Sequence, residues 1–232
     1  MPSDGPHGPG GEIVDAPGWT AIDTYVGSRY PGQTPHQFSS RTAYDLDSQS
    51  PLPAITVWES HGPPCWLYIT YGLTELFDKS SPDPNVSGFG FELSMRVPRA
   101  DGESQPPVWP LRLLQALGHN VLTTRSGFDS GHCIDLGGPM RPDAPTVLAG
   151  LVCVPDPFLG KFDGPFGSIL FLQVVGLSRS ELELFTDWEL PEVVGAIAEL
   201  DSSGLTDPAR GDWMADEQKA KILRRYKVGL KL

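Results

Sequence analysis

The sequence predicts a mixed α+β fold in which a largely antiparallel β-sheet packs against helices. Runs of β-branched and aromatic residues recur along the chain, and segments with apolar residues at helical spacing lie between several of them. The 26 Gly and 24 Pro residues punctuate these runs as turns. Because 39% of the 232 residues are hydrophobic and no Gly-X-Y period is present, collagen-like and fully disordered chains are excluded.

The most regular strand pattern lies at 88–97, where apolar residues alternate with Gly or polar residues and predict one apolar face. Residues 147–154 and 166–175 are almost continuously apolar, which is typical of strands covered on both faces. Further strands are expected at 52–58, 65–71 and 132–136. A polar loop punctuated by prolines is expected over 77–87.

Helices are predicted from periodicity and from their start signals. Trp19, Ile22 and Val26 share one helical face, and Pro110 suits the first turn of a second helix. Ser178 and Glu181 have the spacing of a capping box, so a helix should begin there. Pro191 opens another helix, whose buried side is expected to hold Val193, Val194, Ile197 and Leu200. A final amphipathic helix is expected over 216–227.

Charge is unevenly distributed along this acidic chain, which has a net charge of −12 and a pI near 4.7. A field of this sign disfavours nucleic acid as a partner and is compatible with a basic protein. Residues 180–201 hold seven acidic and no basic side chains, whereas 216–232 hold six basic and two acidic ones. The acidic run fits either a solvated helical face or a docking surface. We therefore divide the chain into a flexible leader (1–16), a body (17–215) and a basic C-terminal helix or tail (216–232).

Targeting signals and cysteine usage favour a cytoplasmic protein. The first residues lack the basic and apolar regions of a signal peptide, and no stretch approaches 18 uninterrupted apolar residues, so no membrane span is expected. The three cysteines form no C-x-x-C pair and make a disulfide scaffold improbable.

Catalytic patterns are weak, so we expect a protein without enzymatic activity and without a cofactor. The chain contains no G-x-S-x-G, no P-loop and no H-E-x-x-H motif. Two remote enzymatic alternatives remain. One is a Cys133 nucleophile, although the adjacent His132 would point to the other face of a strand. The other is a zinc site drawn from His61, Cys65, His119, His132 and Cys133.

A series of motifs, taken in order, resembles the Suppressor of fused family. The resemblance runs from about Trp19 to about Gly211 and matches the N-terminal domain of the animal proteins only. Its most specific stretches are LYITYGLTELF (67–77), SGFGFELSMRVPR (87–99), DGESQPPVWPLRLLQAL (101–117), GPFGSILFLQVVGLSRSELELFTDW (164–188) and LTDPARG (205–211).

The resemblance implies a binding protein. Animal members hold transcription factors by letting a short extended peptide pair with strands. The resemblance to stand-alone bacterial members implies a second setting, in which an immunity protein neutralises a toxin, such as a basic toxin domain. We take neutralising or masking of a protein partner as the leading hypothesis. The alternative is a regulatory scaffold that sequesters a transcription factor or another peptide-bearing protein.

Five residues are candidates for partner contact. In the family, an aromatic residue after the L-x-x-L turn and an acidic residue in the next loop contact peptide; Phe77 matches the first, and Asp83 matches the second approximately. Phe77 could instead be buried under the loop, and Asp83 could be a turn former between two prolines. The acidic run supplies the remaining candidates, Glu181, Glu183 and Asp187.

Overall fold

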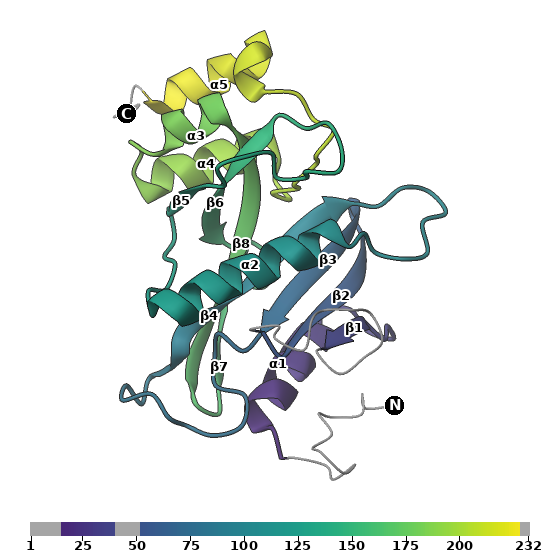
Figure 1. The fold of residues 1–232 in the computed structure, drawn as a ribbon, viewed down its shortest axis with the longest axis vertical. Helices are drawn as coiled ribbons and strands as arrows, with labels where there is room; N and C mark the ends of the chain where they lie inside the picture. Colours follow the sequence, from purple (N-terminus) through teal and green to yellow (C-terminus); the bar gives the residue numbers. More distant parts are fainter. Residues whose placement is uncertain (1–14, 40–51, 228–232) are drawn as a thin grey trace.

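The computed structural model describes residues 15–39 and 52–227 (Figure 1). Its helices are α1 (Pro17–Gly27), α2 (Trp109–Thr124), α3 (Arg179–Phe185), α4 (Leu190–Leu200), the short 3-10 turn η1 (Trp213–Ala215) and α5 (Glu217–Lys227). Its strands are β1 (His36–Ser39), β2 (Ala54–His61), β3 (Pro64–Tyr71), β4 (Val86–Pro98), β5 (Cys133–Asp135), β6 (Leu148–Pro155), β7 (Lys161–Gly164) and β8 (Gly167–Ser178).

All eight strands form one mixed sheet, as the sequence predicted. The strand order is β1-β2-β3-β4-β8-β6-β5, and β7 pairs with the first residues of β8. The pair β4·β8 is parallel, and the other pairs are antiparallel. The long parallel connection from β4 to β8 carries α2, β5, β6 and β7, which places β8 in the middle of the sheet.

One face of the sheet is covered by α2, which runs across it in Figure 1. Leu114, Leu117 and Val121 on the buried stripe of α2 pack into the same core as Leu93 and Met95 of β4. Pro110 lies in the first turn of α2 as expected.

Two separate helical groups cover the opposite face. α1 packs Trp19, Ile22 and Val26 against β2 and β3. At the other end of the sheet, α3, α4 and α5 cluster over β6 and β8, where Val175 and Leu177 face them (Figure 1). The capping box predicted at Ser178 and Glu181 is present at the start of α3.

The structure differs from the sequence-based expectations in three places. The short strands β1 and β7 were not predicted, because four residues carry too little periodicity. β4 has two buried faces over residues 91–97, so its polar residues Glu92, Ser94 and Arg96 are buried as well. Val194 was expected on the buried side of α4 but is 36% exposed.

The basic C-terminal segment forms a helix that packs on the acidic body. Ala220 and Leu223 of α5 are buried, and Leu223 lies in the same core as Val193, Ala196 and Ile197 of α4. Arg225 forms an ion pair with Glu199, which also accepts a hydrogen bond from the Tyr226 hydroxyl (3.1 Å). Apolar docking and charge attraction therefore act together here. The leader expected at 1–16 lies outside the described residues except for its last two.

Candidate functional site

A pocket of about 620 Å³ lies beside Phe77, at the end of β3 and the start of β4. Its walls are the turn that follows β3, the first residues of β4, and the last turn of α2. Phe77 is 39% exposed, so its ring is available at the rim rather than buried under the loop. The lining residues are Gly72, Leu73, Thr74, Glu75, Leu76, Phe77, Asp78, Ser80, Ser81, Gly88, Phe89, Leu122 and Arg125.

The buried carboxylate of Glu92 holds the turn that forms one wall. Its Oε1 accepts hydrogen bonds from the amides of Gly72 (2.9 Å), Leu73 (3.1 Å) and Thr74 (2.9 Å), and from the Thr74 hydroxyl (2.7 Å). The Thr70 hydroxyl donates to Oε2 at 2.6 Å. Burial raises the pKa of Glu92 to about 7, although these donors act in the opposite direction. The turn is therefore fixed by one side chain from the neighbouring strand.

A second carboxylate, Glu75, holds the other wall. Its Oε1 accepts hydrogen bonds from the amides of Ser80 and Ser81 (both 2.5 Å), and its Oε2 pairs with Lys79 (3.0 Å). Burial raises the pKa of Glu75, but the amides of Ser81 and Ser80 and the ammonium of Lys79 outweigh it and lower this pKa to about 2. Phe77 is thus presented between two turns that are each fixed by a carboxylate.

Gly88 allows the start of β4 to lie directly against the turn. Its φ is +55°, and a Cβ there would lie 2.7 Å from the carbonyl oxygen of Leu73. The amide of Phe89 donates to the same oxygen at 2.9 Å. The glycine is required because the backbone is close and left-handed.

The comparisons with known proteins agree with this fold and its motifs. The family model "Suppressor of fused protein (SUFU)" matches residues 48–211, which is more than half of the chain. The chain belongs to the Suppressor of fused family. Curated Suppressor of fused homologs from Homo sapiens and Mus musculus are each 30% identical over 199 residues, which cover 79% of this chain and 41% of the relative. The chain thus spans less than half the length of these Suppressor of fused relatives.

Solved Suppressor of fused structures share the fold. A chain of the Sufu–Fu complex aligns with a TM-score of 0.78 at 27% identity, covering 90% of this chain and 98% of that one. Drosophila Suppressor of Fused aligns with a TM-score of 0.79 at 27% identity, covering 91% of this chain and 55% of that one. A putative SUFU homolog from Neisseria gonorrhoeae has a TM-score of 0.54 at 13% identity, covers 84% of this chain and 96% of that one, and shares the fold alone.

Of the two family-matched positions, only Phe77 lines the pocket. Asp83 is exposed in the following loop, where its carboxylate accepts a hydrogen bond from the Asn85 amide (2.8 Å) and its carbonyl accepts one from the Val86 amide. Asp83 is therefore a turn former in this structure, and one carboxylate oxygen accepts no hydrogen bond from a described residue. The pocket instead contains Asp78 as its exposed acid.

The acidic run does not form one continuous surface. Glu181 was a candidate contact residue, but it is fully buried. It completes the capping box of α3, forms a buried ion pair with Arg210, and accepts a hydrogen bond from the Trp213 amide (2.6 Å). This corrects the expectation that Glu181 faces a partner. Glu183 and Asp187 are exposed, at the end of the sheet covered by α3 and not at the Phe77 pocket.

Sequence reasoning missed the contribution of α2 to the pocket. Leu122 and the exposed Arg125 come from its last turn, about 50 residues along the chain from Phe77. Arg125 caps the helix with a left-handed φ of 57°. No local pattern indicates this placement, because it depends on how α2 crosses the sheet. Leu122 extends the apolar stripe of that helix, and this extension is the signal that could have suggested that α2 contributes to the pocket.

The remote enzymatic alternatives receive no geometric support. Burial raises the pKa of the Cys133 thiol, which disfavours the nucleophilic thiolate, and the exposed His132 accepts a hydrogen bond from the Asp129 amide. Within residues 15–39 and 52–227, no three His, Cys, Asp or Glu side chains are grouped to hold a metal ion. In the same ranges, no helix combines the length and apolar character needed to cross a bilayer.

Proposed function

We propose that this chain is a non-enzymatic protein-binding domain that neutralises or masks a protein partner. The observation that carries the proposal is Phe77, an aromatic side chain that is 39% exposed at the rim of a pocket. Most apolar side chains of this size are buried in the core, and exposed aromatic anchors are enriched where proteins bind one another. We assign binding to residues 17–215, with 216–232 as a basic C-terminal helix or tail.

The rigid walls of the pocket support this function. The carboxylates of Glu92 and Glu75 fix both turns before any partner arrives, so little conformational entropy is lost on binding. Membership in a family that includes a solved Sufu–Fu complex adds support from a relative. The partner would place an apolar group against Phe77 and Leu122 and an acidic group near Arg125.

We further propose that the partner is a basic toxin domain, so that the chain acts as an immunity protein. The net charge of −12 supports a basic partner by accelerating encounter. In this proposal the exposed Glu183 and Asp187 steer association, and Asp83 pairs with a cationic group through its second oxygen. The alternative role is a regulatory scaffold that sequesters a transcription factor or another peptide-bearing protein, and the existence of a Sufu–Fu complex of a relative supports it.

The experiment measures whether the chain binds the product of the neighbouring gene and, if that product carries a toxin domain, whether the chain inhibits it. Phe77→Ala should weaken binding by about tenfold or more, as expected for a hot-spot aromatic residue. Phe158→Ala is the matched control, because Phe158 is 52% exposed and does not line this pocket. Isothermal titration calorimetry gives the affinities, and a toxicity assay gives neutralisation.

Two results separate the parts of this proposal. A toxin domain that is neither bound nor inhibited would contradict the immunity role. Equal affinities for wild type and Phe77→Ala, towards any partner that is bound, would contradict the assignment of the site.

A further inference from the structure

The short strand β7 leaves one edge unpaired within the described chain. Asp163 of β7 lies opposite Ser168 of β8, whose amide donates to the carbonyl of Asn85 on the other side of β8 (2.8 Å). Asp163 therefore occupies a non-hydrogen-bonded position, and its own N–H and C=O point away from β8. Lys161 lies two residues before Asp163 on the same strand, so its N–H and C=O also point away from β8. The edge thus offers two amides and two carbonyls to an additional strand.

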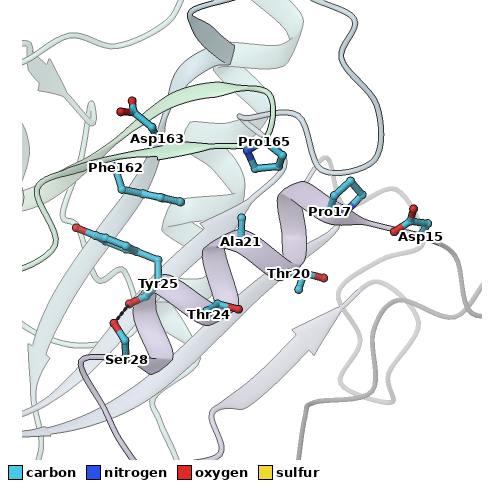
Figure 2. A pocket seen from close by; sticks show the side chains of 10 residues that line it. All are labelled: Asp15, Pro17, Thr20, Ala21, Thr24, Tyr25, Ser28, Phe162, Asp163 and Pro165. Carbon is cyan, nitrogen blue, oxygen red and sulfur yellow. Dashed lines mark hydrogen bonds between the residues drawn. The ribbon is translucent and has the colours of Figure 1, made fainter.

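A groove of about 710 Å³ lies between this hairpin and α1 (Figure 2). Figure 2 shows Ala21 pointing from α1 towards the hairpin, in the space between the Phe162 ring and Pro165. Thr20 and Thr24 of the same helix line the solvent side. A strand edge beside a helix is an arrangement in which a bound peptide gains backbone hydrogen bonds on one side and side-chain contacts on the other.

Aromatic stacking holds the groove open at one end. The rings of Tyr25 and Phe162 are nearly parallel with centroids 4.2 Å apart, and the Tyr25 hydroxyl donates to the Leu159 carbonyl. The Arg29 guanidinium lies 4.0 Å from the Tyr25 ring centroid. These contacts position β7 relative to α1 in the absence of any ligand, so the groove is already formed.

The charge of the groove indicates which kind of segment it fits. Two exposed carboxylates, Asp15 and Asp163, line it. Lys161 lies on the same strand edge and Arg29 lies beside Tyr25, but neither is among its lining residues. Neither carboxylate forms an ion pair with another residue in the described part of the chain. Figure 2 shows the two carboxylates at opposite ends of the groove, with that of Asp163 pointing away from α1. Each would complement a separate basic side chain of an extended segment, whereas acidic side chains would be repelled.

We propose that the groove between α1 and β7 binds an extended, basic segment of a partner protein, which adds as a strand to the free edge of β7. Its backbone pairs with Lys161 and Asp163. Side chains on one face of the segment contact Ala21, Tyr25 and Phe162, and a Lys or Arg pairs with Asp163 or Asp15. This site is separate from the Phe77 pocket, since no residue lines both.

The test uses a displayed library of random heptapeptides selected on the wild-type chain, followed by anisotropy measurements with the synthetic peptides. Selected peptides should contain Lys or Arg. Asp163→Pro should weaken their binding by about tenfold or more, because it removes an outward amide without breaking a bond to β8. Asp163→Ala is the matched control. It keeps the backbone amide and removes only the carboxylate, so the loss of affinity should be smaller than for Asp163→Pro. This loss should decrease as salt is added.

Two further variants keep the test decisive if Asp163→Pro folds poorly. Ala21→Trp fills the groove from the helix side and should abolish binding, whereas Phe77→Ala should leave it unchanged. In hydrogen exchange, bound peptide should slow the amides of Lys161 and Asp163. Peptides whose binding is lost on Phe77→Ala but not on Asp163→Pro or Ala21→Trp would overturn this inference while supporting the Phe77 site.

Two other outcomes would also overturn it. One is a library that yields no peptide sensitive to Asp163→Pro or Ala21→Trp. The other is a concentration-dependent dimer abolished by Asp163→Pro, which would show that a second copy of the chain occupies the edge.

Discussion

Two buried carboxylates, Glu92 and Asp156, have their charges balanced in different ways. Glu92 accepts five hydrogen bonds, all from backbone amides and threonine hydroxyls. Asp156 faces the guanidinium of Arg96, with N–O distances of 2.7 and 3.1 Å. It also accepts hydrogen bonds from the Ser94 hydroxyl and from the amides of Phe158 and Leu159. Arg96 lies four residues after Glu92 on β4, so one strand contributes to both arrangements.

The pKa values move in opposite directions as a result. Burial raises the pKa of Glu92 to about 7, because dipoles alone oppose the loss of water. Burial also acts to raise the pKa of Asp156, but the charge and hydrogen bonds of Arg96 outweigh it, and this pKa is lowered. A full counter-charge therefore keeps a buried carboxylate ionised in acid, whereas amide donors do so only in part. We therefore expect the turn beside Phe77 to respond to pH below about 7.

The largest expected effect comes from removing the counter-charge. Arg96→Met leaves the carboxylate of Asp156 buried without its counter-charge, so the free energy of unfolding should fall by about 3–5 kcal/mol. Urea denaturation at neutral pH measures this. The double variant Arg96→Met/Asp156→Asn should recover part of the loss, because no unpaired charge remains. A double variant as unstable as the single one would show that lost packing, and not charge, is responsible.

The second prediction tests Glu92 through the pH dependence of stability. Its pKa is raised in the folded state, so the folded protein binds this proton more tightly than the unfolded chain. Stability relative to Glu92→Gln should therefore fall as the pH rises from about 4.5 to about 7, by up to about 3 kcal/mol, and then level off. Urea denaturation across this range measures the difference.

Asp156→Asn is the control for that measurement. The lowered pKa of Asp156 places its titration below this range, so its stability difference from wild type should stay constant there. A sloping difference for Asp156→Asn, or a flat one for Glu92→Gln, would contradict the comparison.

The smallest expected effect concerns an exposed ion pair, which serves as a reference for the two predictions on buried carboxylates. The Nη1 atom of Arg179 lies 2.7 Å from Oδ2 of Asp135, but the two side chains are about half exposed (53% and 50%). Arg179→Met should therefore lower the free energy of unfolding far less than Arg96→Met, and the loss should decrease with added salt. A loss comparable to that of Arg96→Met would show that burial is not what separates these pairs.

Most of the helices and longer strands could be predicted because their signals are local. The capping box at Ser178 and the prolines that open α2 and α4 act within one helical turn. The alternation in β4 correctly located the strand, and the exposed Phe77 was found through its motif. The site was only partly predictable, since Leu122 and Arg125 reach it from a distant helix.

The sequence by itself determined where the helices and the longer strands lie, the acidic character of the chain and its membership in a family, because these depend on residue types and short spacings. Only the tertiary structure decided which polar side chains are buried. Glu92, Arg96 and Glu181 resemble surface residues in their local patterns, yet each lies in the interior beside donors or charges from distant segments. The physical reason is that helices cover both faces of the central strands. The local periodicity of a segment does not indicate how those helices pack on it.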